Sequence, residues 1–360
     1  MGINNPRWEE AGNGVQTSPM AGWNPPTGWT RVRTIDAHTA GEPLRIIFDG
    51  FPDLPGASMV DRRRYAREHY DYLRKALMWE PRGHADMYGC VITKPATSGS
   101  DFGVLFLHNE GFSTMCGHGI IAVSKVAVET GLVEMKEPET AIRIDSPAGL
   151  ITSYVRVDRG QVLSIRFHNV PSFALALDQT IDVPGLGSVT YDLAFGGAFY
   201  AYVEAEQLGL KCIPEEYSEL IDRGMAIKHT IMAARPVRHP FESELSFLYG
   251  TIFVASPRSK GADVRNVCVF AEGEVDRSPT GTGVSGLMAL RFARKRLGLN
   301  EPIVVESIIG SSFVGRAVSR TTFGDYEAVV PEVEGSAYIT GKNEFIIDPD
   351  DPLRYGFILR

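Results

Sequence analysis

The sequence predicts a mixed α/β protein made of two similar halves, and three observations support this fold class. A short loop pattern occurs twice, as MCGHG at 115–119 and as PTGTG at 279–283, and an apolar stretch follows each copy. Both halves show the same order of expected elements: strands, a surface helix, strands, a glycine-rich loop, a helix and further strands. The two loops lie nearly as far apart in the sequence as Gly41 and Gly197, a second matching pair. We therefore expect a duplicated architecture with an approximate two-fold axis.

The first half begins with a pair of strands over 31–48, interrupted at 38–43. A helix is expected over 61–79, because Tyr65, Leu73 and Leu77 form one apolar stripe and a proline follows. The remaining elements of this half are a strand over 102–107, a helix over 117–130 and β structure over 141–173 with a hairpin turn at 158–160.

The second half repeats this order. A pair of strands is expected over 192–203, and a helix over 215–234 carries regularly spaced apolar residues. The remaining elements are strands over 247–253 and 266–270, a helix over 281–297 and a β-rich segment over 311–357.

Four segments divide the chain. Residues 1–28 are polar and rich in Asn, Gly and Pro, which predicts a disordered tail. The first lobe is expected over 29–188 with the Cys116 loop, and the second over 189–342 with the Thr280 loop. Residues 343–360 are expected to return to the first lobe.

The composition is that of a soluble globular protein with a substantial core. Hydrophobic residues make up 44% of the 360 residues and charged residues 22%. The net charge of −8 disfavours nucleic acid and anionic membranes as partners, and no apolar run is long enough to cross a bilayer. The N-terminus lacks the features of a signal or transit peptide, and four widely spaced cysteines suit a reducing, cytoplasmic location.

The paired loops predict an anion site between two helix ends. A helix N-terminus presents unpaired N–H groups and a partial positive charge, and glycines allow a ligand to approach closely. Cys116 at such a position is expected to have its pKa lowered to roughly 3.5–7.5, which would make it a base or nucleophile. His118 could bind a ligand carboxylate or tune the thiol, and Asp276 could receive a substrate ammonium.

Other interpretations of the same residues are weaker. Cys90, Cys212 and Cys268 are expected to be inert core residues. A zinc site at Cys116 and His118 would lack further ligands at the usual spacing, so no metal is expected. The second loop lacks the lysine of a phosphate-binding P-loop.

Both loops resemble the two signature motifs of the proline racemase family: MCGHG at 115–119, and DRSPTGTG at 276–283. Further segments that resemble the family are 36–43, 81–84, 86–89, 108–111, 265–267 and 348–360. The resemblance implies the diaminopimelate-epimerase-like fold. In that fold, two pseudo-symmetric lobes each wrap a curved, mostly antiparallel sheet around a central helix, and the site lies in the cleft between them.

The sequence departs from the racemases at one position. Racemases of this family carry cysteine in both motifs, whereas here Thr280 takes the place of the second, as in the trans-3-hydroxy-L-proline dehydratase branch. Racemisation at Cα needs a base on one face and an acid on the other, and a threonine hydroxyl is too weak an acid to alternate with its anion. We therefore expect dehydration of trans-3-hydroxy-L-proline to Δ1-pyrroline-2-carboxylate.

The resemblance also implies roles for individual residues. Cys116 removes the Cα proton, and Thr280 faces the substrate from the other side. No metal or organic cofactor is required. The substrate-binding residues expected are Gly117, His118, Gly281 and Thr282 around the carboxylate, Asp276 at the ring ammonium, and Tyr88, Phe270 and Ser113 near the ring.

Three alternatives stay open. The first is a proline racemase or hydroxyproline 2-epimerase that uses another second acid. The second is a cysteine hydrolase, although the Cys-Gly-His spacing does not itself supply a triad. The third is a non-catalytic imino-acid-binding protein. A small imino acid is the expected partner in each case except the hydrolase, and the state of assembly, including a homodimer, is left open.

Overall fold

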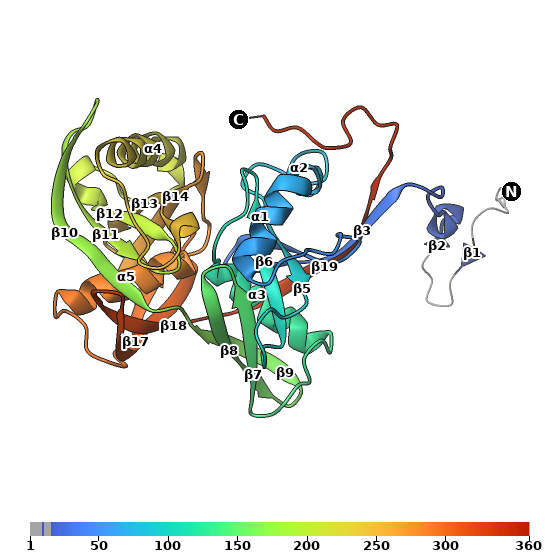
Figure 1. Cartoon of the computed structure of the whole chain (residues 1–360), viewed down its shortest axis with the longest axis horizontal. Helices are drawn as coiled ribbons and strands as arrows, with labels where there is room; N and C mark the ends of the chain where they lie inside the picture. The colour runs from blue at the N-terminus through green and yellow to red at the C-terminus, as the bar shows by residue number, and fades with distance from the viewer. Residues whose placement is uncertain (1–8, 11–15, 360) are drawn as a thin grey trace, which may run out of the picture.

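The computed structural model describes residues 9–10 and 16–359, and it consists of two lobes that lie side by side (Figure 1). The predicted disordered tail falls partly outside the described residues. Within it the structure has a pair of two-residue strands, β1 (Glu9–Glu10) and β2 (Gln16–Thr17), and a single 3₁₀ turn at Pro19–Gly22. In the described part of the chain, no helix is both long and apolar enough to cross a membrane.

In the first lobe, a sheet is wrapped around one central helix, α3 (Gly117–Glu129). Neighbouring strands are antiparallel, except that β4 pairs with β5 and β6 pairs with β7 in parallel. In order across the sheet the strands are β19 (Ala337–Ile347), β3 (Thr30–Thr39), β4 (Glu42–Asp49), β5 (Tyr88–Thr93), β6 (Phe102–His108), β7 (Glu139–Ser146), β8 (Gly149–Asp158) and β9 (Gln161–His168).

Two short helices connect β4 to β5. The single helix predicted over 61–79 is in fact α1 (Met59–His69) and α2 (Asp71–Met78), because the backbone of Tyr70 leaves the helical region with φ −127° and ψ 16°. A capping box between Ser58 and Asp61 fixes the start of α1.

The second lobe repeats this arrangement around α5 (Gly281–Ala293), with α4 (Tyr217–Ala234) on the outside. The parallel pairs are β12 with β13 and β14 with β16, at the places that correspond to those of the first lobe. In order the strands are β10 (Ser172–Val183), β11 (Gly187–Phe195), β12 (Phe199–Glu204), β13 (Leu248–Ala255), β14 (Val264–Phe270), β16 (Ile303–Glu306), β17 (Ser312–Phe323) and β18 (Tyr326–Gly335), and the two-residue β15 (Glu274–Val275) adds to the edge of β14.

The matching strand order confirms the duplicated architecture expected from the sequence. β19 lies beside β3 in the first lobe as β10 lies beside β11 in the second. The lobes also share strands at their junction, because β18 pairs with β9 as well as with β10 and β17. By these pairings the second lobe begins near residue 170, before the predicted boundary at 188. The chain returns to the first lobe at β19, which begins at Ala337, before the predicted return at 343.

The central helices are buried on nearly every side. In α3 all residues from Gly117 to Ser124 are buried, and in α5 all residues from Gly281 to Leu290 are. A helix that is apolar around its whole circumference belongs inside a protein. The sequences of α3 and α5 are largely apolar, as their buried positions require. In these positions the N-termini of the two helices point toward the junction of the lobes.

Candidate active site

The N-termini of α3 and α5 meet at a pair of glycines. A Cβ built on Gly117 would lie 2.5 Å from the Cα of Gly281, and one built on Gly281 would lie 2.6 Å from the Cα of Gly117. Only glycine permits this approach, since real Cβ atoms do not come so close to other heavy atoms. The first N–H groups of both helices have no acceptor within their own helix, so two partial positive charges converge here.

A small cavity of about 20 Å³ lies at this point. That volume is about enough for one water molecule, which needs roughly 10–15 Å³. The cavity is lined by both loops and by an aromatic wall: Tyr88, Met115, Cys116, Gly117, His118, Tyr200, Tyr249, Phe270, Asp276, Thr280, Gly281 and Thr282. It therefore brings together every residue predicted for the site except Ser113, which is buried behind Tyr88.

Cys116 is the N-cap of α3. Its Sγ accepts the N–H of Gly119 at 3.3 Å and lies 3.1 Å from Nδ1 of His118. Burial lowers the pKa of His118 below its ordinary value, so this imidazole is neutral near neutral pH and can accept a hydrogen bond from the Cys116 thiol. Cys116 and His118 thus form a thiol–imidazole pair inside the cavity.

The predicted drop in the thiol pKa is wrong for the closed site. Burial raises the pKa of Cys116 well above its ordinary value, although the N–H of Gly119 opposes this, and the carboxyl groups of Asp276 and Glu42 raise it further. The helix terminus stabilises a thiolate. Burial and the two nearby carboxyl groups destabilise the thiolate by more than the helix terminus stabilises it. The resting thiol is protonated.

Thr280 occupies the position that matches Cys116, but its backbone differs. Its φ of +65° is rare for a residue branched at Cβ, whereas Cys116 has an ordinary φ of −145°. The Thr280 side chain does not cap α5, and its buried Oγ1 has no hydrogen-bond partner of normal geometry among the described residues, although the Cys268 thiol is a neighbour. Strain of this kind concentrates at functional sites.

Asp276 supplies a carboxylate on the second-lobe side of the cavity. It is 5% exposed, and its Oδ1 accepts the N–H of Ser278 at 2.8 Å. This bond holds the carboxylate against the loop that leads into α5.

Hydroxyl groups and aromatic rings form the opposite wall. Oη of Tyr88 lies 2.5 Å from Oγ of Ser113 and 3.4 Å from Oη of Tyr249, and Oη of Tyr200 lies 2.7 Å from Oγ1 of Thr282. Tyr249 and Tyr200 were not predicted from the sequence. Tyr249 stands near the start of β13 as Tyr88 stands at the start of β5, so the duplication itself was a signal that could have identified it.

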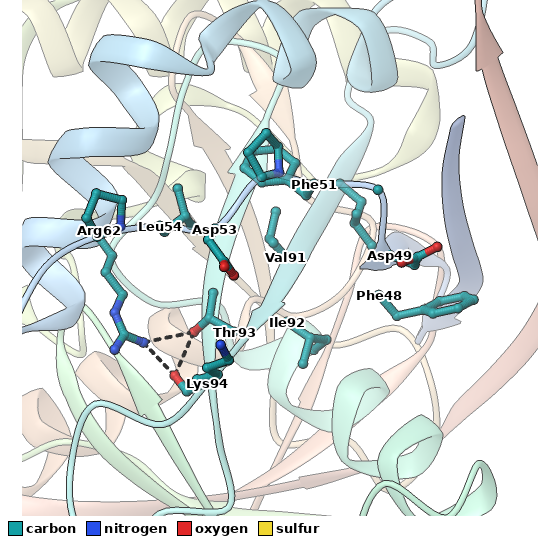
Figure 2. A pocket seen from close by; sticks show the side chains of 14 residues that line it. Phe48, Asp49, Phe51, Asp53, Leu54, Arg62, Val91, Ile92, Thr93 and Lys94 are labelled. Carbon is teal, nitrogen blue, oxygen red and sulfur yellow. Dashed lines mark hydrogen bonds between the residues drawn. The ribbon is translucent and has the colours of Figure 1, made fainter. Parts of the chain in front are cut away.

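A larger hollow of about 500 Å³ lies on the first lobe, between the loop after β4 and strand β5 (Figure 2). Its Arg62 guanidinium is already bound to Oγ1 of Thr93 and to the carbonyl of Lys94, and the Asp49 carboxylate on its rim is paired with Arg33. No cysteine or histidine lines this hollow. The smaller cavity between the lobes, which holds Cys116 and His118, is therefore the candidate site.

A family model described as proline racemase matches residues 34–358. The chain belongs to the proline racemase family. Within this family, it is 48% identical to a trans-3-hydroxy-L-proline dehydratase of Colwellia psychrerythraea, over 91% of this chain and 93% of that protein. It is 47% identical to a protein of Burkholderia multivorans named 3-hydroxyproline 2-epimerase, over 91% of this chain and 98% of that protein.

A solved structure of the family has the same fold. A hydroxyproline epimerase from Agrobacterium vitis with bound trans-4-hydroxy-L-proline superposes with a TM-score of 0.86 at 32% identity, and the match covers 92% of this chain and 96% of that one. A Bacillus anthracis protein of the phenazine biosynthesis PhzF family shares the fold alone, with a TM-score of 0.54 at 11% identity. The predicted two-lobed α/β fold is confirmed.

Proposed function

We propose that this protein dehydrates trans-3-hydroxy-L-proline to Δ1-pyrroline-2-carboxylate. The observation that carries the proposal is the asymmetry of the site, with a thiol at Cys116 and a threonine hydroxyl at Thr280 on the matching loop. The dehydratase names of several relatives with similar identity support it.

Both lobes hold the substrate. Its carboxylate binds the N–H groups at the joined helix ends, where negative charge that develops as the Cα–H bond breaks is also stabilised. Its ring ammonium binds the Asp276 carboxylate, and its ring lies against Tyr88 and Phe270.

Cys116 and His118 move the protons. His118 takes the proton of the Cys116 thiol, and the resulting thiolate removes the Cα proton and becomes a thiol again. The electron pair left on Cα forms a double bond to C3 as the C3–O bond breaks. The proton on His118 joins the departing hydroxide, so water leaves and both side chains return to their resting forms. The enamine product then tautomerises to the imine.

Thr280 faces the ring from the second lobe. Its hydroxyl cannot deliver a proton to Cα from the opposite face, which blocks inversion. No cofactor takes part in this scheme.

A second candidate function is epimerisation of a hydroxyproline, which the name of the Burkholderia multivorans relative favours. The two functions predict different products from one experiment. The purified protein is incubated in D₂O with trans-3-hydroxy-L-proline, trans-4-hydroxy-L-proline and L-proline separately. Pyrroline-2-carboxylate from the first alone supports the dehydratase. Inverted product carrying deuterium at Cα, from any of the three, contradicts it.

A further inference from the structure

One fully buried carboxyl group beside the cavity has no part in this mechanism. Glu42 is the first residue of β4 in the first lobe, and it is 0% exposed. Its Oε2 accepts the backbone N–H of Arg277 at 2.7 Å. Arg277 belongs to the second lobe and directly follows Asp276, so this hydrogen bond crosses between the lobes next to the residue that holds the substrate ammonium.

The Arg277 side chain strengthens the same link. Its Nη1 lies 3.7 Å from Oε2 of Glu42, and its Nη2 lies 3.4 Å from Oδ2 of Asp86, which is also in the first lobe. Oη of Tyr217, in the second lobe, donates to the same Asp86 oxygen at 2.7 Å. Four side chains and one backbone N–H therefore join the lobes on the Asp276 side of the cavity.

The surroundings of Glu42 are unfavourable for the stability of the fold. Its Oε1 is buried and has no hydrogen-bond partner among the described residues. Burial raises the pKa of Glu42 well above its ordinary value, and the nearby carboxylates of Asp276 and Asp86 raise it further, whereas Arg277 lowers it. A buried carboxyl group with an unsatisfied oxygen and like-charged neighbours costs stability. Such a group is expected where position matters more than stability.

We propose that Glu42 is a positioning residue, which fixes the loop of the second lobe through the Arg277 N–H so that the Asp276 carboxylate meets the ring ammonium when the lobes close. The inference rests on the proposed function, because that function assigns the ammonium to Asp276. Glu42 then affects the binding of ligands that carry a ring ammonium, and it does not affect the binding of a carboxylate at the helix ends.

Two ligands separate these effects. L-proline has both a carboxylate and a ring ammonium, whereas cyclopentanecarboxylate has the same ring size and carboxylate but no nitrogen. Their dissociation constants are measured by calorimetry for the wild-type protein and for Glu42→Ala and Glu42→Gln. Alanine removes the acceptor for the Arg277 N–H, whereas glutamine keeps a carbonyl oxygen of the same reach and resembles the protonated acid.

We expect Glu42→Ala to weaken the affinity for L-proline by about tenfold or more, since the charge-assisted contact between Asp276 and the ring ammonium is misplaced. The affinity for cyclopentanecarboxylate should stay within about twofold of the wild-type value. Glu42→Gln is expected to keep both affinities within about threefold. In turnover of trans-3-hydroxy-L-proline, Glu42→Ala should raise KM more than it lowers kcat. Retained binding of cyclopentanecarboxylate shows that the variant is folded.

The matched control is another contact between the lobes. Arg64 Nε lies 2.5 Å from Oε1 of Glu244, and Arg64 is half-exposed on α1. Arg64→Ala should change the two affinities by the same factor. Equal loss of both ligands in Glu42→Ala, or no loss of either, overturns the inference alone while wild-type turnover stands. A wild-type protein that does not dehydrate the hydroxyproline overturns the proposed function first.

Discussion

At the scale of single residues, the chemistry depends on a difference between two matching positions. Cys116 caps its helix through sulfur, while Thr280 adopts a strained backbone and leaves its hydroxyl uncommitted. In the proposed mechanism, this difference in side chain decides which face of the substrate can exchange a proton. Substitutions at these two residues therefore test the mechanism most directly.

Cys116→Ser should lower kcat for dehydration by about 10³-fold or more, because a serine hydroxyl does not give up its proton to His118 at neutral pH. Thr280→Cys should supply a second thiol and introduce inversion at Cα with solvent deuterium incorporation. Both are measured by NMR of the substrate in D₂O. Cys90→Ala, which removes a thiol that does not line the cavity, is the control and should keep kcat. Unchanged turnover in Cys116→Ser would rule out the proposed base.

The pH dependence follows from His118. Burial lowers its pKa below the ordinary value of about 6.5, and the mechanism needs the neutral imidazole. Activity is therefore present above that lowered pKa and is lost as pH falls through it. We expect kcat/KM to stay flat from pH 8 down to about pH 6.5 and to decline only below that. A profile that already falls between pH 8 and 7 would contradict a neutral resting His118.

Residue-scale prediction from sequence had a clear limit. Nine of the twelve residues that line the cavity were predicted from the sequence: those of the two loops other than Met115, Asp276, and the aromatic residues Tyr88 and Phe270. The sign of the Cys116 pKa shift was wrong, because burial and a carboxyl group from β4 are properties of the assembled lobes. Glu42 was overlooked for the same reason.

At the scale of elements, the site exists because the N-termini of α3 and α5 contact each other. Both helices were predicted from their glycine-rich starts and apolar continuations, and both lie close to the predicted bounds. The break between α1 and α2 was not predicted, since the apolar stripe continues across it. Strand β10 was missed over most of its length, because its alternation of buried and exposed residues is irregular around two register shifts.

Gly117→Ala should separate the ends of α3 and α5, because the new Cβ would lie 2.5 Å from Gly281. We expect a loss of about 1–3 kcal/mol in the free energy of unfolding and a larger proportional loss of kcat/KM. Gly111→Ala is the matched control, since nothing lies within 4 Å of its Cβ and its φ is ordinary. Urea unfolding and steady-state kinetics measure both variants, and equal effects would contradict the role of the glycine contact.

At the scale of the whole molecule, the closed cavity is too small for its substrate. About 20 Å³ does not hold an imino acid, so we expect the lobes to move apart for entry and release. The contacts that cross the junction include His108 with Glu274, whose Nδ1 and Oε1 lie 3.1 Å apart and are both buried. Separation of the lobes exposes these groups together with Cys116.

Alkylation should report that opening. In the free protein we expect iodoacetamide to modify Cys116, because opening exposes it and relieves the burial that raises its pKa. Excess L-proline should slow the modification by favouring the closed form. Cys90 and Cys212 are buried and do not line the cavity, so they serve as internal controls in mass spectrometry. A Cys116 that stays unmodified over hours would mean that the lobes do not open.

The pairing of β19 with β3 joins the two ends of the chain within one sheet (Figure 1). During synthesis on the ribosome, β3 emerges before the second lobe, and its partner β19 emerges only after the whole second lobe. Until then β3 keeps an unpaired edge, of the kind that invites association between chains. The first lobe therefore completes its sheet only after the second lobe has been made, and a chain that stops before residue 337 is expected to aggregate even though its second lobe is entirely made.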